Sequence, residues 1–200
     1  MPNPEMLNLL ACQISIPAMT TAAERDAHLA TSVDKVLASL ETSDKPVDLV
    51  VLPELSSIDY SRDTFSRLDE IAEPLDGASF QAWRKVAIER GVYVSYGFAR
   101  AGDGGPYISC AVVGPDGELV GYYDKLHLAQ YGASMEKEYF NRGNHLFVFE
   151  IKGFRLALII CYDIRIPELS RTLVIDQNVD VILHCGAYAR DASFHTWHPF

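Results

Sequence analysis

One short, nearly continuous apolar run constrains the fold of this chain more than any other feature. It covers residues 47–52 and stops abruptly at Pro53-Glu54. A run of this kind is typical of a strand that other layers cover on both faces. The chain is therefore expected to build a layered fold around buried strands, rather than a bundle of helices or an exposed sheet.

Strand and helix patterns alternate along the rest of the chain. Apolar residues recur at helical spacing from Ala22 to Leu40, and Thr20 or Thr21 is suited to cap that helix. Two further helices are predicted, over 79–90 (ended by Gly91) and over 167–176. The other predicted strands cover 7–16, 92–98, 108–113, 119–123, 146–151, 154–160 and 179–183. Helices at both ends and hairpins in the middle predict a layered α/β architecture with a mixed sheet, in a single domain over residues 1–200.

Charge and cysteine usage narrow the function classes. The chain has 17 Lys+Arg and 27 Asp+Glu, for a net charge of −10, so neither a nucleic acid nor an anionic membrane is expected as a partner. The uncharged stretch 6–23 is too polar to span a bilayer and has no basic residue before it, so we expect a cytoplasmic protein. Four widely spaced cysteines without a CxxC pair favour a lone nucleophile over a disulfide framework.

Three residues suited to chemistry follow predicted strands. Glu54 follows 49–52, Lys125 follows 119–123, and Cys161 follows 156–160. Ligands in open α/β sheets gather outside the carboxyl ends of strands, so the three side chains are predicted to share one pocket. Each has an ordinary alternative, since a cysteine after an apolar strand is commonly core, and single glutamates and lysines are commonly solvated.

The residues around these three carry a family resemblance. Leu52-Pro53-Glu54, Tyr123-Asp124-Lys125-Leu126-His127-Leu128 and Cys161-Tyr162-Asp163-Ile164-Arg165-Ile166-Pro167-Glu168 follow one another in this order. This arrangement resembles the nitrilase, or carbon–nitrogen hydrolase, superfamily over effectively the whole chain. The resemblance implies a four-layer αββα sandwich with a Glu-Lys-Cys triad of Glu54, Lys125 and Cys161. It also implies a thioester mechanism without metal or organic cofactor, and assembly into homodimers or larger homo-oligomers.

Further site residues follow from the same resemblance. The family carries a second glutamate seven residues before a glycine, which fits Glu136 before Gly143 better than it fits its rival Glu138. The predicted substrate-binding residues are Tyr60, Tyr162, Arg165 and His184, and the backbone N–H of Tyr162 is expected to help hold the oxyanion. Structural roles for each, such as an ion pair of Arg165 or packing of Tyr60, remain alternatives.

The motif after the cysteine favours an amidase acting on a small linear carboxamide, as in ω-amidases. True nitrilases usually place Trp-Glu after the cysteine where this chain has Tyr162-Asp163, and an N-carbamoyl amino acid hydrolase is the nearest enzymatic rival. His184, Cys185, His195 and His198 raise the alternative of a zinc hydrolase, although their spacing is poor for zinc. Family domains continue beyond Phe200 with a helix and further strands, so we expect a domain incomplete at its C-terminus; an inactive fragment or an interaction scaffold is the alternative from another class.

Overall fold

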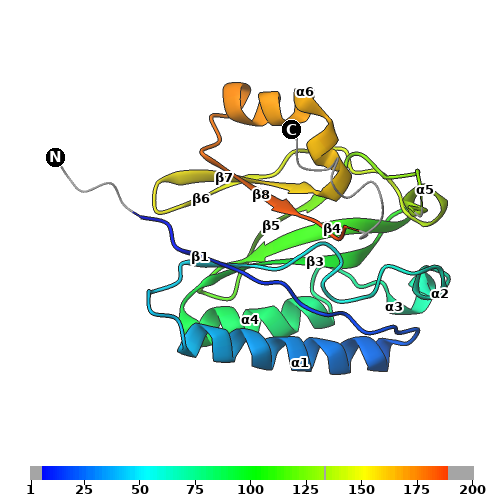
Figure 1. Cartoon of the computed structure of the whole chain (residues 1–200), viewed down its shortest axis with the longest axis horizontal. Helices are drawn as coiled ribbons and strands as arrows, with labels where there is room; N and C mark the ends of the chain where they lie inside the picture. Colours follow the sequence, from blue (N-terminus) through cyan, green and yellow to red (C-terminus); the bar gives the residue numbers. More distant parts are fainter. Residues whose placement is uncertain (1–5, 133, 189–200) are drawn as a thin grey trace.

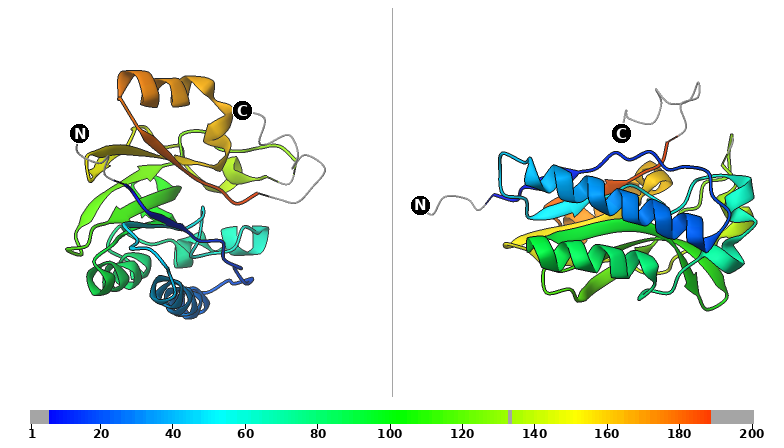
Figure 2. Two further views of the ribbon diagram at one scale, coloured as in Figure 1. Left: turned by 60° about the vertical axis from the view of Figure 1, so that its left-hand side comes forward. Right: turned by 90° about the horizontal axis from the view of Figure 1, so that it is seen from below.

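Two β-sheets lie face to face between helices in the computed structural model, which describes residues 6–132 and 134–188. The five-stranded sheet has the order β1-β2-β3-β4-β5 and the three-stranded sheet the order β6-β7-β8. Helices α1 and α4 cover the outer face of the first sheet, and α6 covers that of the second (Figures 1 and 2). The predicted αββα layering is confirmed, with two mixed sheets where the strand pattern alone indicated one.

The elements have the following bounds. The first sheet contains β1 (Leu9–Ala11), β2 (Leu49–Val51), β3 (Tyr93–Gly102), β4 (Gly105–Val113) and β5 (Leu119–Asp124). The second contains β6 (Val148–Ile151), β7 (Phe154–Ile160) and β8 (Val181–Cys185). The helices are α1 (Ala22–Glu41), α2 (Arg62–Phe65), α3 (Leu68–Ile71), α4 (Ala78–Arg90), α5 (Glu136–Tyr139) and α6 (Pro167–Arg171).

Strand direction decides which ends can meet. β1, β2 and β3 are parallel, and β7 and β8 are parallel, whereas β3, β4 and β5 form antiparallel hairpins. The segments that follow β2, β5, β7 and β8 carry the residues from which the site is built. Four chain segments, each at the end of a strand, therefore contribute residues to the site.

The helix ends follow their sequence signals. Of the two predicted caps, Thr21 is the one used: its hydroxyl accepts a hydrogen bond from the Glu24 N–H, and the Glu24 carboxylate accepts one from the Thr21 N–H. Gly91 ends α4 in the left-handed conformation, with φ of 65°. Both helices bury an apolar face against the first sheet, with Val36 and Trp83 in the same buried cluster.

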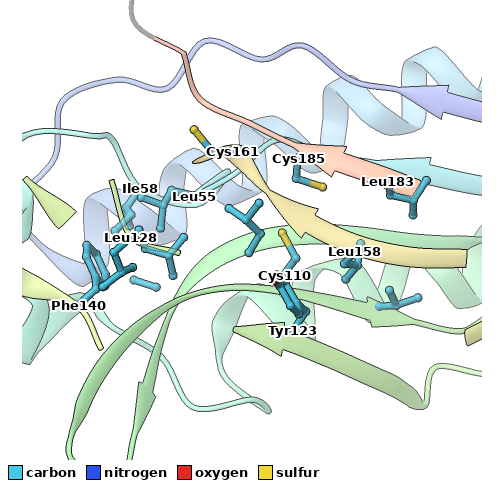
Figure 3. Close-up of a cluster of buried hydrophobic side chains, with 14 of the residues drawn as sticks. Leu55, Ile58, Cys110, Tyr123, Leu128, Phe140, Leu158, Cys161, Leu183 and Cys185 are labelled. Atoms are coloured by element: carbon cyan, nitrogen blue, oxygen red, sulfur yellow. The ribbon is translucent and has the colours of Figure 1, made fainter. Parts of the chain in front are cut away.

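The largest buried cluster fills the space between the two sheets. It joins residues from β2, β4 and β5 with residues from β7 and β8, among them Cys110, Leu158 and Leu183 (Figure 3). Because the two inner faces share one core, removing material from either sheet loosens the packing of the other.

Several predicted elements differ from the structure in extent, and the strand over 7–16 and the helix over 167–176 are two of them. The strand over 7–16 shrinks to Leu9–Ala11 because its partner β2 ends before Pro53, which has no N–H for the ladder. The helix over 167–176 divides into α6 and a π-type turn over Thr172–Asp176. The sequence reading also missed α2, α3 and the 3₁₀ turn Cys161–Arg165. None of the helices within the described ranges combines the length and the hydropathy needed to cross a membrane.

Candidate active site

Glu54 lies in the turn that follows β2 and is completely buried. The strand still pairs through the Leu52 N–H and the Ser95 carbonyl, and Pro53 then ends the ladder. Gly97 allows the turn to approach β3, since a Cβ at that position would lie 2.4 Å from the Pro53 carbonyl oxygen. The alternative of a solvated glutamate is wrong: the chain enters the core at this point.

Lys125 follows β5 and is also completely buried. Its Nζ lies 2.7 Å from Glu54 Oε1 and 2.8 Å from Glu136 Oε1. Its carbonyl accepts the Gly143 N–H at 2.9 Å, and a Cβ on Gly143 would lie 2.1 Å from the Asp124 carbonyl oxygen. The glycine seven residues after Glu136 therefore has a physical reason, because it packs on the backbone of the lysine that Glu136 contacts.

Glu136 and Glu138 separate into different environments. Glu136 is buried, accepts the Ala129 N–H at 2.8 Å through Oε2, and accepts the Tyr60 hydroxyl at 3.0 Å through Oε1. Glu138 is exposed and pairs with Arg62 at 2.8 Å. The structure thus brings Glu136 to Lys125 and leaves its rival at the surface.

Cys161 begins the 3₁₀ turn directly after β7 with φ of 46°. This left-handed conformation costs a non-glycine residue about 1–2 kcal/mol, so the surrounding contacts must hold it. Its thiol is turned away from Cys110 and Cys185, which lie between the sheets (Figure 3). Of these three buried cysteines, Cys161 stands at a strand end in a strained turn, where nucleophiles are commonly found.

The charges around the thiol are unbalanced. One ammonium, Lys125, faces two carboxylates, Glu54 and Glu136. Burial alone would lower the pKa of Lys125, but the two carboxylates and Cys161 outweigh it and hold the pKa well above the usual value. Burial raises the pKa of Glu136, and Lys125 only partly opposes that effect.

The environment of the thiol favours its protonated form. Burial and then the nearby Glu54 carboxylate raise the pKa of Cys161 well above the ordinary value, while Lys125 opposes them. A thiol in this state needs a base to become a nucleophile. Glu54 is the base placed for this role, because its carboxylate accepts a hydrogen bond from Lys125 Nζ at 2.7 Å and its charge acts on the Cys161 thiol.

The other predicted site residues surround this cluster. Tyr60 contacts Glu136 through its hydroxyl and stacks edge-on with Phe65, with ring centroids 5.0 Å apart. His184 Nε2 lies 3.1 Å from the Cys161 carbonyl oxygen. Tyr162 is half-buried and its ring centroid lies 5.4 Å from that of Tyr131.

Two tyrosines that the sequence reading did not single out also lie near the thiol. Burial, followed by the charge of Cys161, raises the pKa of Tyr131 to about 12, and the half-buried Arg165 acts on the same hydroxyl in the opposite direction. Tyr188 lies 2.7 Å from His184 Nε2 through its hydroxyl, and burial and Cys161 raise its pKa. No motif or spacing in the sequence distinguishes these two tyrosines from the others, so only the fold shows that they lie together.

A cavity of about 440 Å³ opens beside Glu54, between residues 11–16 and residues 184–188. The Ala187 N–H donates to Glu54 Oε2 at 3.0 Å, so the segment after β8 closes over the carboxylate. Among the described residues, no group of three or more His, Cys, Asp or Glu side chains is arranged to hold a metal ion. His195 and His198, which the zinc alternative requires, lie outside the described residues.

Comparison with known proteins gives consistent results. The model of the carbon–nitrogen hydrolase family matches residues 11–200. A nitrilase from Pyrococcus abyssi is 36% identical over 146 residues, which cover 72% of this chain and 53% of that protein. An omega-amidase, NIT2 from Xenopus tropicalis, is 32% identical over 154 residues, covering 74% and 54%. The structure of Saccharomyces cerevisiae Nit3, a member of the nitrilase superfamily, has a TM-score of 0.78 at 21% identity, covering 94% of this chain and 68% of that one. The chain spans about half the length of the curated relatives that it matches.

Proposed function

The chain belongs to the carbon–nitrogen hydrolase family, and on this premise we propose that it is a cysteine-dependent amidase. It hydrolyses a small linear carboxamide to the acid and ammonia through a thioester on Cys161, and residues 1–200 form one hydrolase domain. The observation that carries this proposal is the buried Lys125 ammonium between Glu54 and Glu136, beside the Cys161 thiol.

In the first half of the reaction, Cys161 Sγ attacks the carbonyl carbon of the amide while Glu54 accepts the thiol proton. Because the pKa of the thiol is raised, the thiol does not need to ionise first: the base removes the proton while the sulfur attacks. Glu54 then returns the proton to the amide nitrogen, ammonia leaves, and the acyl group remains on sulfur as a thioester.

The oxyanion of the tetrahedral intermediate is held by Lys125 and by the backbone N–H of Tyr162. A fixed donor of this kind contributes about 3–4 kcal/mol to transition-state stabilisation. The contact with Glu136 holds the lysine in place, since Nζ lies 2.8 Å from Oε1. In the second half of the reaction, Glu54 removes a proton from water as the water attacks the thioester, and it gives that proton to Cys161 Sγ as the acid leaves.

The residues after the cysteine and the names of the relatives support the proposed substrate class. Tyr162-Asp163 favours amides over nitriles, and relatives named omega-amidase and 2-oxoglutaramate amidase are 32% and 33% identical to this chain. An N-carbamoyl amino acid or a nitrile is the alternative substrate, the latter supported by the nitrilase relative.

Ammonia release from a panel of small amides, carbamoyl amino acids and nitriles tests the proposal. Wild type is compared with Cys161→Ala and with Cys12→Ala, a matched control at the half-buried cysteine beside the cavity. We expect turnover of amides by wild type and Cys12→Ala and none by Cys161→Ala. Hydroxylamine added to the reaction should divert the thioester to a hydroxamate.

Three results would contradict the proposal. Substantial turnover by Cys161→Ala would exclude Cys161 as the nucleophile. Loss of turnover with a chelator would indicate the zinc-dependent alternative. Absence of turnover on the whole panel by a folded wild-type protein would favour the inactive or scaffold alternative.

A further inference from the structure

We propose that Asp163 is a positioning residue of this centre, which fixes the Cys161 turn to the segment that carries Lys125. The idea deepens the proposed function and depends on it for its turnover measurement. Asp163 is completely buried, and it comes from the second sheet's side of the site, whereas Lys125 comes from the first sheet.

The Asp163 carboxylate is surrounded by four donors. Oδ2 accepts the Ile160 N–H at 3.0 Å and the Tyr123 hydroxyl at 2.8 Å. Oδ1 accepts the His127 N–H at 2.9 Å and lies 2.9 Å from His127 Nδ1. Four contacts match the acceptor sites that a carboxylate offers, and hydrogen bonds to an ionised acceptor are stronger than neutral ones.

The donors to Asp163 come from the two segments that carry Lys125 and Cys161. Tyr123 and His127 lie two residues before and two residues after Lys125. Ile160 and Asp163 itself flank Cys161. One buried carboxylate therefore holds the chain on both sides of the lysine and on both sides of the nucleophile, and so fixes the position of Sγ relative to Nζ.

The strained backbone of Cys161 explains why such a contact is needed. A residue at φ of 46° relaxes unless its neighbours determine its conformation from several directions. Asp163 holds the N–H that precedes Cys161, and the Asp163 carbonyl accepts the Ile166 N–H at 3.0 Å to close the turn. His184 contacts the Cys161 carbonyl from β8. Removing the carboxylate of Asp163 takes away the contacts that join the turn to the Lys125 segment, whereas the His184 contact from β8 remains.

A purely structural aspartate would behave differently from a positioning residue. Its loss would lower the stability of the protein, but the Cys161 thiol in the surviving folded molecules would keep its environment beside Glu54 and Lys125. The two roles are therefore separated by the pH dependence of the Cys161 thiol, which reports that environment directly and needs no substrate.

Asp163→Asn is the first variant, because it keeps the size of the side chain and replaces one acceptor oxygen by an NH₂ donor. We expect kcat to fall on the order of a hundredfold with KM nearly unchanged, since the misplaced atom is the nucleophile. Iodoacetamide alkylation, followed at each cysteine by mass spectrometry, should show the Cys161 midpoint falling from its raised value toward about 8.5, the value of a free thiol. Cys12 serves as the internal reference and should not change.

His127 supplies a graded test with its own control. His127→Asn keeps a side-chain donor for Asp163, whereas His127→Ala removes it, so the asparagine variant should lie closer to wild type in kcat and in the alkylation profile. His145→Ala is the matched control, because His145 contacts the Tyr122 carbonyl beside the same strand and does not reach Asp163 in the described contacts. It should match wild type in both measurements.

A folded Asp163→Asn protein with a wild-type Cys161 alkylation profile would overturn the proposal, whatever its melting temperature. If Asp163→Asn does not fold, Tyr123→Phe removes a single donor and is judged by the same profile. If wild type turns over no substrate, the proposed function fails on that result alone, and the alkylation profile still decides the role of Asp163.

Discussion

Two consecutive residues at the end of β5 carry opposite charges into two different environments. Asp124 pairs with Arg100 through both carboxylate oxygens, at 2.9 and 2.6 Å, and also accepts the Ser109 hydroxyl. The guanidinium of Arg100 lies over the rings of Tyr107 and Tyr122. The next residue, Lys125, places one ammonium between two carboxylates beside a thiol.

The difference lies in the balance of charge rather than in burial. At Asp124 one carboxylate pairs with one guanidinium through two hydrogen bonds. The two charges neutralise each other, so no carboxylate in this pair is left to accept a proton. At Lys125 the second carboxylate is in excess, and in the proposed reaction Glu54 takes the proton of Cys161 while Glu136 keeps the ammonium in place. A buried cluster whose charges do not cancel shifts the pKa values of its members, and groups with shifted pKa values gather at functional sites.

The strongest test of this comparison removes each cation in turn. Lys125→Met should lower kcat on the order of 10²–10³-fold through the lost oxyanion donor and destabilise the protein by about 3–5 kcal/mol through two unpaired buried carboxylates. Arg100→Met should cost stability by about 1–3 kcal/mol for the unpaired Asp124, with kcat within about threefold of wild type. Steady-state kinetics and urea unfolding of both variants measure the contrast.

Equal effects of the two variants on kcat would break the comparison. They would show that Lys125 acts only as a structural partner, like Arg100, and that its ammonium lies away from the reacting carbonyl.

A smaller effect is expected from a single methyl group beside the Lys125 backbone. In Gly143→Ala the new Cβ would lie 2.1 Å from the Asp124 carbonyl oxygen and 2.7 Å from its carbon, so the backbone before Lys125 must move. We expect kcat to fall about tenfold or more and stability to fall by about 1–3 kcal/mol.

Gly91→Ala is the matched control at the end of α4. It has φ of 65° and no atom within 4 Å of the added Cβ, so only the left-handed backbone opposes it, at about 1–2 kcal/mol. Its kcat should equal that of wild type. Wild-type kcat in Gly143→Ala would show that the position of Lys125 tolerates a backbone shift.

Pattern and topology made part of this site predictable. Glu54 and Cys161 each follow a buried strand, and ligand sites gather at the ends of such strands, so their convergence follows from the strand pattern. Lys125 was predicted in the same pocket because it follows the predicted strand over 119–123, and the order of the three motifs added the family resemblance. The alternating periods of helix and strand predicted a layered α/β fold with one mixed sheet, and only the family resemblance implied the two-sheet αββα arrangement that the structure has.

Contacts between distant segments were beyond the reach of the pattern. Asp163 and His127 lie 36 residues apart, and neither period nor composition relates them. The short helices α2 and α3 were missed because four residues carry too little periodicity, and local caps such as that of Ser61 on Thr64 hold α2. The early end of β1 depends on where its partner turns away, which is a property of β2 and Pro53.

The same comparison can be drawn between Glu136 and Glu138, where the expected effect is smallest. Burial raises the pKa of Glu136 in the folded state, so above the unfolded value of about 4.3 the folded protein holds more protons than the unfolded chain. The stability that protonated Glu136 contributes is complete below that value and is lost as the pH rises through the folded pKa. The side-chain hydrogen bond from Arg62 lowers the pKa of the exposed Glu138, so its contribution is present above about 4.3 and is lost as the pH falls.

Urea unfolding between pH 4 and pH 7 should therefore show that Glu136→Gln flattens the decline of stability with rising pH, whereas Glu138→Gln leaves that decline in place. An unchanged slope in Glu136→Gln would mean that Lys125 fully compensates the burial of Glu136, and the excess negative charge assigned to this centre would then have no measurable effect on its protons.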